Sequence, residues 1–132
     1  MAFKPMSEIG VSKFAPAVGW SAALVFLAVW SLPAPEVLAF SLVDKVKHGA
    51  AYGALGLLWA VALFAVSRRP RWLLAAAAAA LAFAWGALTE IVQSFVPGRQ
   101  ADLADLAADA LGVVICVLAY WWANPTDVEA PR

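Results

Sequence analysis

The sequence predicts an all-α, polytopic membrane protein with about four transmembrane helices, and two observations lead to that prediction. First, 64% of the 132 residues are hydrophobic and 14% are charged, whereas an ordinary soluble domain is about half apolar and about a quarter charged. A core of this size does not need so much apolar surface, so lipid must cover part of it. Second, four separate apolar stretches approach the roughly 20 residues that a helix needs to cross the hydrocarbon. The length suits one compact unit, so a single domain over residues 1–132 is expected.

The first two stretches cover about residues 14–32 and about residues 46–66. Residues 33–36 lie between them and contain two prolines, which break a helix. The first stretch could instead be a cleaved signal peptide, because Lys4 and Lys13 precede it. Its apolar run is longer than a usual signal core and no clear A-x-A site follows, which favours a membrane anchor.

The third and fourth stretches cover about residues 72–95 and about residues 103–122. A charged turn, residues 67–71, precedes the third, and residues 97–98, Pro-Gly, precede the fourth. The fourth is weaker, because three aspartates lie at or inside its start. The alanine run at residues 75–80 predicts a surface for close helix packing, since small residues let membrane helices approach.

The basic residues predict that both termini lie in the cytoplasm (N-in, C-in). With four crossings, six of the nine basic residues then lie on the inner side, as the positive-inside rule requires. These six are Lys4, Lys13, Arg68, Arg69, Arg71 and Arg132. Tryptophans also fall at predicted helix ends, as expected of an aromatic belt: Trp30, Trp72, Trp121 and Trp122.

The unusual polar residues form one stripe on each of the last three predicted helices, because they recur at helical spacing. The stripe on the second helix contains Asp44, His48, Tyr52 and Gly56. The stripe on the third contains Gly86, Glu90 and Gln93, and that on the fourth contains Asp102, Asp105, Asp109, Gly112 and Cys116.

These stripes predict a polar pocket in the outer half of the bundle. Ionisable groups at membrane depth nearly always face the bundle interior or a wet cavity, because exposure to hydrocarbon is costly. The expected lining is Asp44, Lys45, His48, Tyr52, Glu90, Gln93, Arg99, Asp102, Asp105 and Asp109.

The same residues resemble the VanZ-like family. Its first block is similar to residues 44–48, Asp-Lys-Val-Lys-His, followed by Tyr52 and Leu55-Gly56; its second is similar to Gly86, Glu90, Gln93, Pro97-Gly98-Arg99, Asp105 and Gly112. The likeness covers residues 44–112, with Asp109 where the family usually has Asn and Gly49 where an aromatic residue is common. The family is named for a protein linked to low-level resistance to the glycopeptide teicoplanin. The resemblance therefore implies a multi-pass protein of the bacterial cytoplasmic (inner) membrane, part of the cell envelope, and raises a link to antibiotic resistance.

Three residues of the pocket carry alternative interpretations. His48 is a candidate catalytic residue that could shuttle protons with Asp44 fixing its tautomer, or it simply makes a hydrogen bond between helices. Glu90, the second catalytic candidate, is a proton acceptor or ion ligand, or forms a structural ion pair with Arg99. Arg99 follows a Pro-Gly turn and suits bidentate capture of phosphate or carboxylate, or it is an interfacial arginine reaching toward water.

The three aspartates of the fourth helix could ligate Mg²⁺ or Ca²⁺. Asp102 and Asp105 also suit the first turn of a helix, where the dipole favours negative charge, but Asp109 lies too far in. No metal site and no cofactor are expected, and a single histidine disfavours zinc.

Three functions remain open. The first is binding or modulation of an envelope lipid or lipid-linked precursor, with the anionic headgroup in the outer pocket. The second is an enzyme acting on a lipid or phosphate headgroup, although one histidine excludes a phosphohistidine scheme that needs a second histidine as acid. The third is a structural or accessory subunit. The expected partners are membrane lipids, and the net charge of zero gives no attraction to nucleic acid; the oligomeric state is left open.

Overall fold

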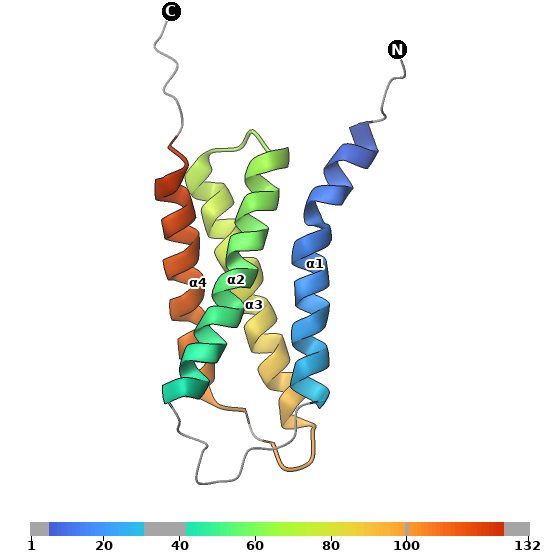
Figure 1. Ribbon diagram of the computed structural model, residues 1–132, viewed down its shortest axis with the longest axis vertical. Coiled ribbons are helices and arrows are strands. Elements are labelled where there is room, and N and C mark those ends of the chain that lie inside the picture. Colours follow the sequence, from blue (N-terminus) through green and yellow to red (C-terminus); the bar gives the residue numbers. More distant parts are fainter. Residues whose placement is uncertain (1–5, 31–41, 100, 126–132) are drawn as a thin grey trace, which may run out of the picture.

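The computed structural model describes residues 6–30, 42–99 and 101–125, and these residues form four α-helices. They are α1 (Met6–Trp30), α2 (Leu42–Val66), α3 (Arg71–Ser94) and α4 (Leu103–Ala123). The helices run alternately up and down, side by side (Figure 1). All four are long and apolar enough to cross a membrane, and the described residues contain no strand. The predicted all-α fold with four spans is therefore confirmed.

Two helices begin earlier than the apolar stretches that predicted them. α1 begins at Met6 and α2 at Leu42, rather than near residues 14 and 46. A helix does not stop where its hydrophobicity stops, because its backbone hydrogen bonds continue through polar residues. Asp44 in the first turn of α2 favours the early start, since the helix dipole attracts a negative charge there. The proline-containing connection at residues 33–36 lies outside the described residues.

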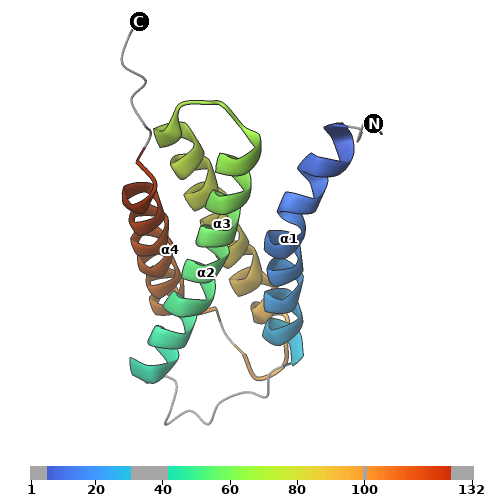
Figure 2. The ribbon, with the colours of Figure 1, turned by 45° about the horizontal axis from the view of Figure 1, so that its top comes forward.

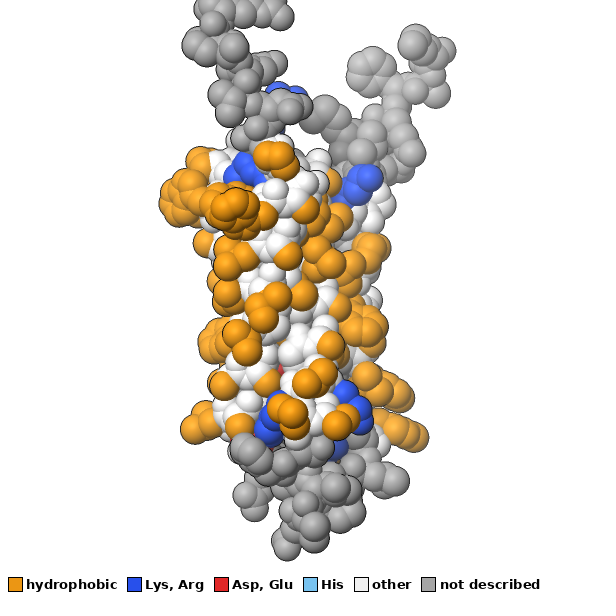
Figure 3. Space-filling view, turned by 60° about the vertical axis from the view of Figure 1, so that its left-hand side comes forward, with side chains coloured by type: hydrophobic (Ala, Val, Ile, Leu, Met, Phe, Trp, Pro, Cys, Tyr) orange, Lys and Arg blue, Asp and Glu red, His pale blue; other side chains and the backbone are white. Residues whose placement is uncertain are grey.

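The surface of the bundle is suited to lipid. At most 33% of the residues in each span are buried inside the bundle. On the face shown in Figure 3, hydrophobic side chains cover the middle and Lys and Arg side chains lie near both ends. Trp72 and Trp122 are 66% and 77% exposed at the end where α3 begins and α4 ends. This distribution matches the hydrocarbon layer and its two interfaces.

The helix α2 is the central element of the bundle. It contacts each of the other three described helices, and its contact with α4 is the most extensive. Figure 2 shows α2 between α1 and α4. The two backbones nearly touch: a Cβ added to Gly112 would lie 1.9 Å from the carbonyl oxygen of Gly49. Leu55 and Val113, both fully buried, fill the core beside this contact.

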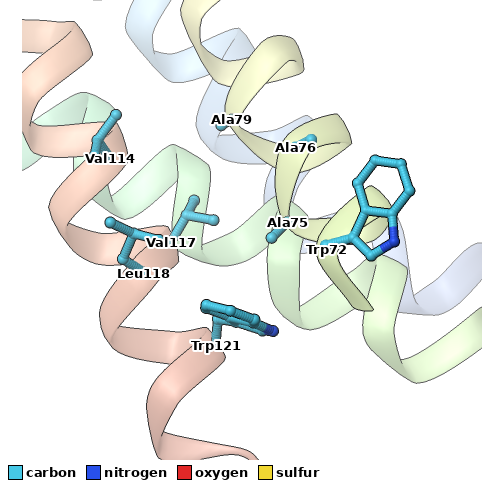
Figure 4. Close-up of a pocket in the computed structure, with 8 residues that line it drawn as sticks. All are labelled: Trp72, Ala75, Ala76, Ala79, Val114, Val117, Leu118 and Trp121. Atoms are coloured by element: carbon cyan, nitrogen blue, oxygen red, sulfur yellow. The ribbon is translucent and has the colours of Figure 1, made fainter. Parts of the chain in front are cut away.

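The alanine-rich half of α3 packs in part as predicted. Ala78 is fully buried in the core, and Ala75 and Ala79 pack against it, whereas Ala76 and Ala80 are exposed. Between this half of α3 and the C-terminal half of α4 lies an apolar groove of about 240 Å³ (Figure 4). Its lining is Trp72, Ala75, Ala76, Ala79, Val114, Val117, Leu118 and Trp121.

The helix α1 lies at the edge of the bundle. Among the described helices it packs against α2 and α3 and not against α4. Two indole groups fasten it: Trp20 Nε1 donates to the Ala51 carbonyl at 2.9 Å, and Trp85 Nε1 donates to the Ser21 carbonyl at 3.0 Å. α1 therefore contributes no residue to the polar end of α4, where the candidate site lies.

Candidate functional site

The polar stripes of α2, α3 and α4 meet at one end of the bundle. The first turns of α2 and α4 and the last turns of α3 lie at this end, opposite the α2–α3 connection (Figure 1). Because these three helices are in mutual contact, side chains on their facing stripes converge. We call this convergence the polar cluster; its members are Asp44, Lys45, His48, Tyr52, Glu90, Gln93, Arg99, Asp102, Asp105 and Asp109.

Lys45 joins the start of α2 to the start of α4. Its Nζ lies 2.6 Å from Asp102 Oδ2 and 2.5 Å from Asp105 Oδ1. The Lys45 side chain is only 14% exposed. One ammonium group therefore offsets part of the charge of two carboxylates, and its attraction to both offsets the cost of burying it.

Asp102 is the N-cap of α4, at the helix start where the sequence analysis expected its negative charge to be favoured. Its side chain accepts a hydrogen bond from the Ala104 amide at 2.7 Å. The Lys45 ammonium and, second, the Ala104 amide hold the pKa of Asp102 below its usual range. The stability that Asp102 contributes is therefore present above its unfolded pKa and is lost as the pH falls through the lowered value.

His48 lies one turn deeper, between two aspartates of α4. Its Nδ1 lies 3.1 Å from Asp109 Oδ1, and its Nε2 lies 3.7 Å from Asp105 Oδ2. When Asp109 is ionised, Nδ1–H donates to it, because an ionised carboxylate only accepts hydrogen bonds. The sequence analysis gave the tautomer-fixing role to Asp44, and the structure gives it to Asp109. The close contact of α2 with α4 brings Asp109 to the imidazole. Sequence spacing does not give the distance between these two residues, because they belong to different helices.

Asp109 is the most deeply buried charged residue of the polar cluster. Its exposed fraction is 0%, and its Oδ2 has no hydrogen-bond partner within the described part of the chain. This oxygen points toward α3, where a Cβ added to Gly86 would lie 3.2 Å from it. A carboxylate oxygen left unpaired at membrane depth is costly, so it marks a place where another group is needed.

Glu90 connects the end of α3 to the start of α4. Its Oε2 accepts a hydrogen bond from the Asp102 amide at 2.8 Å, and its side chain is buried. Oriented by its neighbours, the Gln93 amide donates to Glu90 Oε1 at 3.3 Å and accepts from Arg99 Nη1 at 3.0 Å. Gln93 thus lies between Glu90 and Arg99, the two residues for which the sequence analysis considered an ion pair.

Arg99 follows a tight turn after α3. Gly98 adopts φ 81°, a conformation that residues with a side chain rarely take, so the Pro-Gly pair is needed to turn the chain here. The turn places the half-buried Arg99 so that Gln93 joins its guanidinium to the Glu90 carboxylate.

Thr89 adjoins the polar cluster through Tyr52 and was missed by the sequence analysis. It is buried, its hydroxyl donates to the Gly86 carbonyl at 2.8 Å, and it is hydrogen-bonded to the Tyr52 hydroxyl. Because the Thr89 proton is used on Gly86, the Tyr52 hydroxyl is the donor to Thr89. The available signal was its spacing: Thr89 lies three residues after Gly86, on the same helix face.

The opposite end of the bundle carries a different kind of surface. A hollow of about 600 Å³ lies there, lined by Arg69, Pro70, Arg71, Trp72, Trp121, Trp122 and Pro125. Arg71 donates to the Trp121 carbonyl at 2.9 Å and lies over the Phe64 ring, 4.9 Å from its centroid. Among the described residues, no carboxylate takes part in this lining.

The fold and the polar cluster define the class: a small multi-pass membrane protein whose ionisable residues gather at one end of a four-helix bundle. The chain belongs to the VanZ/LLP1 family, because the family model matches residues 5–124, nearly the whole chain. The match confirms the resemblance and extends it beyond residues 44–112 on both sides. No curated protein and no solved structure matches the chain significantly. The family is linked to teicoplanin resistance, which fits a protein of the cell envelope.

Proposed function

We propose that this protein binds the anionic headgroup of an envelope lipid or lipid-linked precursor through the polar cluster, at the outer face of the bacterial cytoplasmic membrane. The observation that carries the proposal is the chain of contacts from Arg99 through Gln93 to Glu90. These contacts hold the Arg99 cation next to the buried Glu90 carboxylate. We place this end of the bundle at the membrane interface, at the depth of lipid headgroups.

Arg99 is the residue that we propose to contact the headgroup. A guanidinium carries five N–H donors in a planar fork that fits phosphate or carboxylate oxygens in pairs. The Gln93 oxygen at 3.0 Å from Nη1 orients that fork. An oriented arginine loses less side-chain entropy when it binds, which favours affinity.

We assign Lys45 a structural role in the proposed site. Its ammonium is bound to Asp102 and Asp105, so it stabilises the site rather than attracting the ligand. The exposed lysine of this segment, Lys47, faces away from these aspartates and adds positive charge at the interface. We propose that Arg99 attracts an anion at this end, with Lys47 adding to the local potential.

A second candidate function is an enzyme acting on the same headgroup. The observation that favours it is the His48–Asp109 contact at 3.1 Å, because a buried carboxylate orients an imidazole for proton transfer. Glu90 is a second acid or base within the same cluster. In this version His48→Gln abolishes turnover of a headgroup substrate while leaving headgroup binding in place.

The test is ligand-induced stabilisation of the purified full chain in detergent. Phosphatidylglycerol and a polyprenyl phosphate are the anionic probes, and phosphatidylcholine is the neutral one. A ligand present at 100 times its Kd stabilises the folded state by about 2.7 kcal/mol. We expect both anionic probes to raise Tm in the wild type and Arg99→Gln to lose most of that rise.

The matched control is Arg69→Gln, which removes an arginine from the opposite end of the bundle. It should keep the full response to both anionic probes. Equal losses in the two variants would mean nonspecific attraction to basic surfaces and would overturn the proposal. A response to polyprenyl phosphate but not to phosphatidylglycerol would assign the site to lipid-linked precursors.

A further inference from the structure

Three potential metal ligands come from three different helices and meet inside the polar cluster. They are His48 of α2, Glu90 of α3 and Asp109 of α4. One nitrogen of His48 and one carboxylate oxygen from each acid all lie within 4.8 Å of one another. Glu90 and Asp109 are buried, and the His48 side chain is 21% exposed. Convergence from three helices makes the arrangement depend on the fold and not on local sequence.

The unpaired oxygen of Asp109 is an independent sign that a ligand belongs here. Asp109 Oδ1 contacts His48, whereas the fully buried Oδ2 has no hydrogen-bond partner in the described structure. A second carboxylate, Glu90, adds negative charge to the same interior. Two buried carboxylates carry a combined charge of −2, which one divalent cation would neutralise.

We propose that His48, Glu90 and Asp109 bind a divalent transition-metal ion of the Mn²⁺ or Zn²⁺ type. A donor set of one imidazole and two carboxylates suits these metals, whereas Mg²⁺ and Ca²⁺ prefer oxygen ligands alone. The sequence analysis expected no metal site, and the single histidine disfavoured zinc in particular. The structure adds what the sequence could not show, namely that two acids from other helices complete the set.

The surroundings of the three ligands support the assignment. The Asp102 amide and the Gln93 amide both donate to Glu90, which fixes the orientation of its carboxylate. Such outer contacts orient the ligands of known metal sites. Both Glu90 oxygens keep a further lone pair, so the hydrogen bonds leave coordination possible.

A competing set of Asp44, His48 and Asp105 also lies within 4.8 Å. We favour the deeper set because Lys45 Nζ is 2.5 Å from Asp105 Oδ1, so a cation already occupies that carboxylate. Asp44 and Asp105 are also only partly buried, so water can donate hydrogen bonds to their carboxylate oxygens. The two sets share His48, so only substitution of the acids separates them.

The experiment measures Mn²⁺ and Zn²⁺ binding to the full chain, purified in detergent and stripped with a chelator, by calorimetry and by Mn²⁺ electron paramagnetic resonance. We expect one equivalent per chain, with Mg²⁺ binding at least tenfold more weakly. Asp109→Asn and Glu90→Gln should each weaken Mn²⁺ binding at least tenfold. Asp44→Asn, which breaks only the competing set, should change the Kd less than twofold.

A second variant guards against misfolding of the acid substitutions. Gly86→Ala removes no charge but places a methyl group about where the Asp109 Oδ2 atom needs room, at the 3.2 Å given above. It should weaken Mn²⁺ binding while the stripped protein keeps its helical circular dichroism.

Three outcomes would overturn the proposal: no saturable Mn²⁺ or Zn²⁺ binding, loss of binding in Asp44→Asn alone, or unchanged binding in Asp109→Asn. The metal site does not depend on headgroup binding. Arg99→Gln should keep Mn²⁺ binding while losing the lipid response, so failure of one proposal is distinguishable from failure of the other.

Discussion

Two lysines separated by one residue have different surroundings in this bundle: one is partly buried and paired, and the other is exposed. Lys45 and Lys47 belong to the same turn of α2, but successive residues of a helix point about 100° apart. Lys45 therefore faces α4 and binds Asp102 and Asp105, whereas Lys47 is exposed. The pair offers a direct comparison of a partly buried charge with an exposed one in the same chemical setting.

At the residue scale we predict that Lys45→Met destabilises the protein strongly. The substitution keeps an unbranched side chain only one atom shorter than lysine and leaves two carboxylates without their cation. Removing one partner of a buried ion pair costs about 3–5 kcal/mol, and the 38% exposure of the Asp102 side chain favours the lower end, about 3 kcal/mol. The measurement is reversible unfolding in mixed detergent micelles.

Lys47→Met is the matched control for that measurement. An exposed substitution of this kind changes stability by about 0.5 kcal/mol or less. If both variants lost the same stability, the ion pairs of Lys45 would contribute nothing specific, and the two lysines would differ only in position.

At the element scale, the contact between α2 and α4 sets the geometry of the polar cluster. Gly49 and Gly112 let the two backbones approach, and Lys45 and His48 then reach the three aspartates of α4. A larger residue at this contact would push the two helices apart beside the polar cluster. The glycines are therefore as important to the site as the charged groups that they bring together.

We predict that Gly112→Ala destabilises the bundle and loosens the polar cluster. The added methyl would overlap the Gly49 carbonyl, which is backbone and cannot rotate away. Overpacking of this kind costs about 1–3 kcal/mol or more. Unfolding in detergent and Mn²⁺ binding should both weaken.

Gly19→Ala, in α1, is the control because a Cβ there meets nothing within 4 Å. Replacing a helical glycine by alanine stabilises a helix by about 0.5–1 kcal/mol, so this variant should be neutral or slightly more stable. A Gly112→Ala protein as stable as Gly19→Ala would contradict the close α2–α4 contact.

The elements were predictable from sequence to different degrees. Hydropathy located all four helices, because each apolar run approaches the roughly 20 residues that a helix needs to span lipid. The helix starts at Met6 and Leu42 were not predictable in this way, since helices extend into water on backbone hydrogen bonds. The membership of the polar cluster was predictable because each stripe has the period of a helix.

The pairings within the cluster were not predictable. Whether His48 contacts Asp44 or Asp109 depends on the relative height of α2 and α4, which the Gly49–Gly112 contact sets. The role of Thr89 depends likewise on Tyr52 reaching across from α2. Local periodicity gives the face of a helix, whereas the partner on the next helix comes from packing.

At the scale of the whole molecule, α1 begins and α4 ends at the same end of the bundle, and the polar cluster lies at the other (Figure 1). Four antiparallel spans place both termini on one side of the membrane. The positive-inside rule predicts that this side faces the cytoplasm, because the α2–α3 connection there carries Arg68, Arg69 and Arg71. The polar cluster is then expected to face outward.

We predict that single cysteines report this orientation in intact cells. In a Cys116→Ala background, Ala101→Cys should react with a membrane-impermeant maleimide added outside. Ser67→Cys, in the α2–α3 connection, should react only after the membrane is permeabilised. The reverse pattern would place the polar cluster in the cytoplasm and would overturn the proposed outer headgroup site.

The salt bridges between α2 and α4 also bear on how the chain enters the membrane during synthesis. Asp105 and Asp109 lie in the first two turns of α4. An aspartate opposes the insertion of a lone transmembrane segment by about 2.5–3.5 kcal/mol at its centre and by less toward its ends. The residues that offset this penalty, Lys45 and His48, belong to a helix made earlier. When α4 leaves the ribosome, α2 already presents the cation and the imidazole. The order of the helices along the chain thus makes α2 a template for the insertion of α4.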